Sequence, residues 1–205
     1  MPKGADFVTA PGVVAPLCKL LVVIGLSAGG LKALITLLSN LRRDFDFPII
    51  VVLHLHRDYK SVLATLLARR TGLRVQAAMD GKLTGGVIYV APPDRHVTLK
   101  DGKVKLIRSA PVRHLRPSID VLFESAARDG TFRVVAVVLS GLGTDGTAGI
   151  STVKAMGGTT IAQSPETAQF RSMPSAAIAT GCVDLVLSSS KIGEVLGKLP
   201  TPANG

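Results

Sequence analysis

Unbroken runs of Val, Ile and Leu, separated by helix-patterned stretches, constrain the fold of this chain more than any other feature. Strand-like runs occur at Leu20–Ile24, Pro48–Leu53, Val87–Val90, Arg133–Leu139, Thr159–Ala162 and Val183–Leu187. Helix-like stretches separate several of them, at Leu31–Leu41, Tyr59–Arg70, Ser118–Ala127 and Thr147–Met156. Unbroken apolar runs indicate strands covered on both faces. The alternation therefore predicts an α/β fold, a doubly wound, mostly parallel sheet with helices on both faces.

One segment departs from this alternation. The apolar runs His96–Lys100 and Val104–Ile107 flank Asp101-Gly102, a dipeptide that favours a tight two-residue turn. An antiparallel hairpin over about residues 96–107 is therefore expected to sit on the otherwise parallel sheet.

The 205 residues suit one well-buried domain, predicted at 18–198, with flexible tails at 1–17 and 199–205. No apolar run reaches the length of about 18 residues that a bilayer crossing needs, and the start of the chain lacks the pattern of a signal peptide. Cysteine occurs only at Cys18 and Cys182, too few for a disulfide framework. These observations predict a cytoplasmic protein without membrane insertion.

The charge balance favours anionic partners. Lys and Arg number 24 against 14 Asp and Glu, a net charge of +10. Aromatic residues make up only 4%, Trp is absent and no nucleic-acid-binding motif is present, so nucleic acid is not expected as a partner. An acidic protein surface stays open as a partner.

Three polar residues follow predicted strands at positions that suit chemistry. Ser27 lies in Gly25-Leu26-Ser27-Ala28-Gly29-Gly30, His54 follows Leu53 directly, and Asp145 lies in the loop after Leu139. In a parallel sheet, ligands gather at the carboxyl ends of the strands. A serine, a histidine and an aspartate that meet there are the minimum for acyl chemistry through an activated serine.

Each residue also has a structural interpretation. Ser27 and Asp145 could cap helices, and His54 could be a hydrogen-bonded residue that closes a strand. Ser140 is the second candidate nucleophile and His56 the substitute base, whereas His96, His114 and Cys182 are interpreted as structural. The joint occurrence of three such residues at equivalent strand ends favours the catalytic interpretation.

No cofactor or metal site is expected. The glycines around Ser27 match neither the dinucleotide pattern Gly-x-Gly-x-x-Gly nor a Walker loop, because no Gly-Lys-Ser/Thr follows them. The two cysteines are far apart, and His54 and His56 have only Asp58 as a nearby carboxylate, so no cluster has the spacing of metal ligands.

Five motifs in order resemble the catalytic domain of CheB, the chemoreceptor methylesterase family. They are Ile24-Gly25-Leu26-Ser27-Ala28-Gly29-Gly30, Val52-Leu53-His54, Arg116-Pro117-Ser118-Ile119-Asp120-Val121-Leu122-Phe123, Leu139-Ser140-Gly141-Leu142-Gly143-Thr144-Asp145-Gly146 and Met173-Pro174-Ser175-Ala176-Ala177. The resemblance spans roughly residues 18 to 198.

The resemblance implies a Ser-His-Asp triad with Ser27 as nucleophile, His54 as base and Asp145 as orienting acid. Backbone N–H groups of Ala28 and Leu142 are expected to hold the oxyanion. The family hydrolyses glutamyl methyl esters on the acidic cytoplasmic helices of chemoreceptors, releases methanol and also deamidates certain receptor glutamines, without a cofactor. The alternative is a non-catalytic adaptor that docks an acidic receptor helix in the same crevice.

The chain departs from the family pattern at several points. Ala28 replaces a hydroxyl residue beside the nucleophile, Leu53-His54-Leu55 replaces Gln-His-Met, and Leu142 replaces a methionine. These changes spare the triad and affect the expected substrate contacts and rate. The phosphorylatable receiver domain that normally precedes the catalytic domain is not in this sequence, so the expected regulator is unknown.

Overall fold

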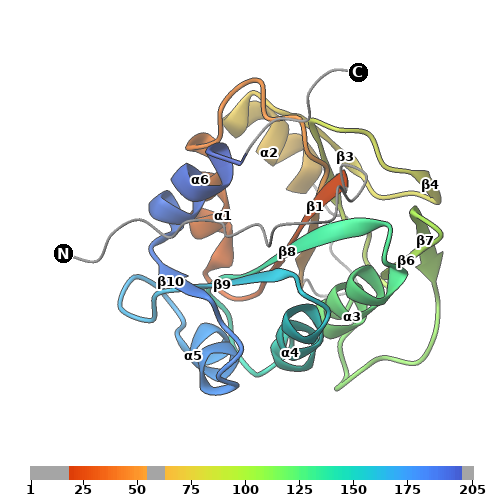
Figure 1. Ribbon diagram of the computed structural model, residues 1–205. Coiled ribbons are helices and arrows are strands. Elements are labelled where there is room, and N and C mark those ends of the chain that lie inside the picture. The colour runs from red at the N-terminus through yellow and green to blue at the C-terminus, as the bar shows by residue number, and fades with distance from the viewer. Residues whose placement is uncertain (1–18, 55–62, 200–205) are drawn as a thin grey trace, which may run out of the picture.

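Seven parallel strands form the central sheet, and their order reverses beside β1. The computed structural model describes residues 19–54 and 63–199. The strands are β1 (Lys19–Leu26), β2 (Ile49–Leu53), β3 (Arg74–Ala77), β5 (Val87–Val90), β8 (Phe132–Val138), β9 (Thr159–Gln163) and β10 (Leu185–Leu187). Their order is β10-β9-β8-β1-β2-β5-β3 (Figure 1). The chain builds outward from β1 on one side and returns through β8 on the other.

Helices cover both faces of this sheet, so the predicted doubly wound α/β fold is confirmed. One face carries α1 (Gly30–Ser39), α2 (Leu63–Thr71) and α6 (Ser189–Gly197), and the other carries α3 (Ile119–Asp129), α4 (Thr147–Ala155) and α5 (Ser172–Ala179) (Figure 1). Side chains of β1 alternate between the two cores: Leu21 and Val23 pack with α3, and Val22 and Ile24 pack with α1. Both sides of β1 are buried, which explains its unbroken apolar sequence.

The predicted hairpin exists, but its predicted place on the parallel sheet is wrong. Strands β6 (His96–Lys100) and β7 (Lys103–Ile107) pair antiparallel and join β4 (Gly81–Lys82) in a separate three-stranded sheet. The apolar side chains of the hairpin, among them Val97 and Leu99, are buried in the same core as α3. The backbone N–H of Leu99 donates to Ser125 Oγ of α3 at 3.1 Å. The hairpin therefore covers a helix, while β3 and β10 form the edges of the main sheet.

Four elements were not predicted: β3, β4, α5 and α6. Strands β3 and β4 are short and largely exposed, so they carry little apolar pattern. Helix α6 contains Gly193, where an added Cβ would lie 2.3 Å from the Leu37 carbonyl oxygen of α1. A glycine that weakens the helix signal is thus the residue that lets these helices pack closely.

The predicted tails and the start of the predicted helix Tyr59–Arg70 fall outside the described residues, except for Leu199, which is buried in the core. Within residues 19–54 and 63–199, no helix is both long enough and apolar enough to cross a membrane.

Candidate active site

The carboxyl ends of β8, β1 and β2 meet in one place. The backbone N–H of Ser27, just after β1, donates to the Ser140 carbonyl at 3.0 Å, and the N–H of His54 donates to the Leu26 carbonyl at 3.2 Å. These bonds hold the three strand ends side by side where the strand order reverses, the position at which open α/β sheets bind ligands. Ser27, His54 and the loop that carries Asp145 therefore lie together at the carboxyl end of the sheet.

The structure brings His54 and Asp145 into direct contact. His54 Nε2 lies 2.8 Å from Asp145 Oδ2, and the two side chains are only 10% and 1% exposed. Because Asp145 accepts from Nε2, the lone pair of the neutral ring is on Nδ1. Within the described residues the Ser27 hydroxyl makes no hydrogen bond, so it is available to a substrate or to the histidine.

The N-terminus of α3 holds the Asp145 carboxylate. Ser118 Oγ donates to it at 2.9 Å, and the backbone N–H groups of Ile119 and Asp120 donate at 2.7 and 3.0 Å. Burial alone would raise the pKa of Asp145, but the hydrogen bonds from His54, Ile119 and Asp120 outweigh it and lower the pKa to about 2. Asp145 is therefore ionised at neutral pH and fixed in orientation.

Two glycines allow the close approaches that shape this site. An added Cβ on Gly25 of β1 would lie 2.4 Å from Ile119 Cγ2, so Gly25 lets the first turn of α3 reach the strand end. An added Cβ on Gly141 would lie 2.9 Å from Ser27 Cβ. Larger residues at either position would push Asp145 or Ser27 out of place.

Asp120, whose backbone N–H donates to Asp145, also has a buried carboxylate. Its Oδ1 accepts from the backbone N–H groups of Gly146 and Gly149, at 2.9 and 2.8 Å, at the start of α4. Burial raises the pKa of Asp120 to about 6, and the neighbouring Asp145 charge adds to the rise, against opposing contributions from Gly149 N–H and Arg113. The sequence predicted Asp120 in the first turn of a helix capped by Ser118, which is confirmed, but its contact with the start of α4 had no sequence signal.

The rival residues have other roles in the structure or lie outside it. Ser140 is buried, and its hydroxyl donates to the Ala28 carbonyl at 3.0 Å and accepts from Phe170 N–H at 3.0 Å. His96 is buried: its Nδ1 accepts from Ser118 N–H and its Nε2 lies 3.2 Å from the Ala110 carbonyl. His114 is exposed, and His56 falls outside the described residues.

The expected oxyanion donors lie in the loops that follow β1 and β8. Ala28 follows Ser27, and Leu142 lies between Gly141, whose N–H donates to the Phe170 carbonyl, and Gly143, whose N–H donates to Ser172. The N–H groups of Ala28 and Leu142 have no acceptor among the described residues. Both are thus free to donate to a ligand.

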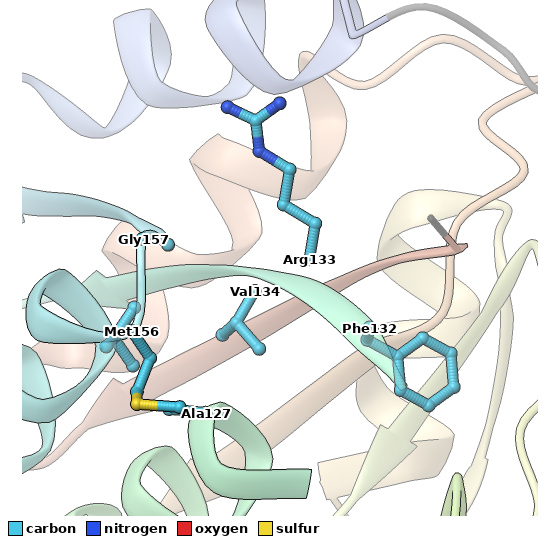
Figure 2. A pocket seen from close by; sticks show the side chains of 8 residues that line it. Ala127, Phe132, Arg133, Val134, Met156 and Gly157 are labelled. Atoms are coloured by element: carbon cyan, nitrogen blue, oxygen red, sulfur yellow. The ribbon is translucent and has the colours of Figure 1, made fainter. Parts of the chain in front are cut away.

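Two further features of the described residues bear on where a ligand could bind. Residues 19–54 and 63–199 contain no group of three or more His, Cys, Asp or Glu that could hold a metal ion. A cavity of about 40 Å³ lies at the opposite, amino end of β8, lined by residues that include Ala127, Val134 and Met156 (Figure 2). Figure 2 shows Arg133 and Val134 extending to opposite sides of the strand.

Comparison with known proteins places the whole described domain in one family. The family model "CheB methylesterase" matches residues 22–196. The chain belongs to the CheB methylesterase family. The structure superposes on the crystal structure of the Thermotoga maritima CheB methylesterase catalytic domain with a TM-score of 0.83 and 38% identity, over 88% of this chain and 98% of that one.

Curated relatives carry the same two activities in their names. "Protein-glutamate methylesterase/protein-glutamine glutaminase 2" of Anaeromyxobacter dehalogenans is 40% identical over 179 residues, 87% of this chain and 52% of that protein. The putative protein of the same name in Leptospira interrogans, serovar Lai, is 36% identical over 87% of this chain and 93% of its own length. The chain spans about half the length of several of these CheB relatives.

Proposed function

We propose that this chain is a protein-glutamate methylesterase that hydrolyses glutamyl methyl esters on chemoreceptor cytoplasmic helices and deamidates receptor glutamines. The observation that carries the proposal is the 2.8 Å hydrogen bond between His54 Nε2 and the buried Asp145 carboxylate, beside the half-buried corner at Ser27. Membership of the CheB methylesterase family supports the same activity. A substrate on cytoplasmic helices would place the protein in the cytoplasm, and the net charge of +10 suits an acidic partner.

In the proposed mechanism, His54 Nδ1 removes the proton from Ser27 Oγ as this oxygen attacks the ester carbonyl carbon. The negative oxygen of the tetrahedral intermediate accepts from Ala28 N–H and Leu142 N–H. His54 then gives its proton to the leaving methoxide, which departs as methanol. Water then attacks the acyl carbon while His54 takes its proton, the bond from this carbon to Ser27 Oγ breaks, and His54 returns the proton to Ser27 Oγ as the glutamate side chain is freed.

Asp145 supports these steps without taking the proton. Its bond to Nε2–H keeps the Nδ1 lone pair of His54 directed away from α3, and its charge stabilises the imidazolium that forms during each transfer. For a glutamine substrate the leaving group is ammonia, and the same donors and base apply.

The test is methanol release from a receptor fragment carrying methyl-labelled glutamyl esters. Ser27→Ala should lower turnover by about 10⁴- to 10⁶-fold, since loss of a triad nucleophile has effects of this size, with the circular dichroism spectrum unchanged. Ser140→Ala is the matched control and should retain most of the turnover of its folded fraction. Near-parental turnover in Ser27→Ala would refute the assignment, and absence of serine-dependent turnover in the parent would favour the adaptor.

A further inference from the structure

Asp120 is a buried, ionisable side chain that the proposed mechanism does not use. It lies in the first turn of α3, 4% exposed, and its Oδ1 accepts from Gly146 N–H and Gly149 N–H of the segment that begins α4. Asp145 precedes Gly146 directly and binds the first turn of α3 in return. The N-terminus of α4 thus binds the Asp120 carboxylate of α3, and the N-terminus of α3 binds the carboxylate of Asp145, which lies just before α4.

We propose that Asp120 is a positioning residue that fixes Asp145 by holding Gly146 and the start of α4 against α3. This inference rests on the proposed function and deepens it. Gly146, which follows Asp145, is bound to the same turn of α3 that binds the Asp145 carboxylate. The backbone and the side chain of Asp145 are therefore both held against α3. Gly146 has φ +102 and no side chain of its own to anchor the loop, so the Asp120 contact supplies the anchor.

A carboxylate does more at this position than a neutral acceptor would. Charged acceptors bind N–H groups more strongly than neutral ones, and a negative charge stabilises the N-terminus of α4. The charged neighbours are Asp145, which repels Asp120, and Arg113, whose Nη1 lies 3.6 Å from Asp120 Oδ2. His54 reaches the pair only through Asp145, and His96 only through the backbone of Ser118.

Arg113 binds the residue that precedes Asp145. Its Nη1 donates to the carbonyl and hydroxyl oxygens of Thr144, at 3.2 and 3.0 Å, and Thr144 precedes Asp145. The residues before and after Asp145 are therefore both held by groups from 113–120. Arg113 is half exposed, so it can be replaced without disturbing the core.

Because Asp120 positions Asp145, protonation of Asp120 should lower kcat/KM at acidic pH. Burial and the Asp145 charge raise the pKa of Asp120 to about 6, within the range in which a histidine base titrates. Protonated Asp120 is a weaker acceptor, so the Asp145 loop should loosen as this proton binds. The acidic limb of log kcat/KM against pH should then be steeper by the proton that binds Asp120 than in a variant without this carboxylate.

The experiment compares Asp120→Asn with the parent and with Asp129→Asn. Asp129 ends the same helix and likewise accepts backbone N–H groups, from Gly102 and Thr131, so it is the matched control. In Asp120→Asn, kcat should fall roughly 10- to 100-fold with KM unchanged, the loss expected when hydrogen bonds to a charged group are weakened. The acidic limb of log kcat/KM against pH should be less steep in Asp120→Asn than in the parent, whereas Asp129→Asn should keep the parental rate and slope.

Arg113→Gln keeps Asp120 and provides a test that does not depend on the folding of Asp120→Asn. Removal of the arginine charge should shift the midpoint of Asp120 protonation to higher pH. The inference is overturned if Arg113→Gln reproduces the parental profile, or if a folded Asp120→Asn keeps the parental slope. A parent without Ser27-dependent turnover would overturn the proposed function and this inference together, whereas an active parent with unaltered variants overturns the inference alone.

Discussion

The N-termini of α3 and α4 face each other and bind carboxylates in the same way, yet the pKa values of the two carboxylates are shifted in opposite directions. The pKa of Asp145 is lowered to about 2, and that of Asp120 is raised to about 6. Both side chains are nearly inaccessible to solvent, so burial alone does not separate them. The difference lies in the donors that each carboxylate receives.

Asp145 accepts from four donors: His54 Nε2, Ser118 Oγ and two backbone N–H groups. Asp120 accepts from two N–H groups and has Arg113 at the longer distance of 3.6 Å. Hydrogen bonds to the charged form offset desolvation at the first carboxylate and fall short at the second. The residue beside the histidine is thus kept permanently charged, and its neighbour is left able to titrate.

Removing the histidine should reduce this asymmetry, because it takes one of the four donors from Asp145, and should give the largest effect on turnover. His54→Ala should lower kcat by about 10⁵- to 10⁶-fold, as for the loss of a triad base, and should raise the pKa of Asp145. Ester turnover and carboxyl-carbon NMR report the two effects. His56→Ala is the control and should be far milder; the reverse order would move the base to position 56.

Substituting the two carboxylates separates them by rate. Asp145→Asn should lower kcat by about 10⁴-fold, because an amide can donate to His54 Nε2 and stabilise the tautomer whose Nδ1 carries the proton. Asp120→Asn should lose far less, as argued above. Methanol release at pH 8 measures both variants in one assay. Equal losses would mean that the two aspartates act as one structural unit and that Asp145 has no special role toward His54.

The sequence contained enough to predict the main sheet and to bring Ser27, His54 and Asp145 to one edge of it. Unbroken apolar runs marked the central strands because both faces of β1 are buried, and residues that follow adjacent parallel strands must lie together. Asp120, Arg113 and His96 could not be assigned in this way. Their contacts join segments that are distant in the chain and depend on how α3 docks on Gly25, which has no periodic signature.

The pH dependence of the free energy of unfolding should reveal the opposite pKa shifts of Asp145 and Asp120. Asp145 has a folded pKa below its unfolded value of 3.8, so its contribution is present above about pH 4 and is lost as pH falls toward 2. The shift corresponds to roughly 2 kcal/mol. Asp120 has a raised folded pKa, so its contribution is present below about pH 4 and is lost as pH rises through about 6.

Urea unfolding of the parent and both Asn variants from pH 2.5 to 8 tests this. The stability advantage of the parent over Asp145→Asn should shrink below pH 4, and its advantage over Asp120→Asn should shrink between pH 4 and 6. Parallel curves for all three proteins would contradict the assigned pKa directions.

The smallest expected effect is that of Ser118→Ala. The Ser118 hydroxyl both caps α3 and donates to Asp145. Its hydroxyl oxygen accepts from Val121 N–H as the cap of α3 and its O–H donates to Asp145. Ser118→Ala should cost about 1 kcal/mol of stability through the lost cap, and a few-fold in kcat through the lost donor to Asp145. Ser188 caps α6 through Lys191 N–H and is the matched control.

Ser188→Ala should lose a similar amount of stability with kcat unchanged, since α6 covers the opposite face of the sheet from α3. Thermal melts and ester turnover at saturating substrate separate the two contributions. If both alanine variants lowered kcat equally, the effect would come from general loosening of the fold. A fall in kcat confined to Ser118→Ala would show that the fourth donor to Asp145 matters for the rate, since both serines cap a helix through the N–H three residues on.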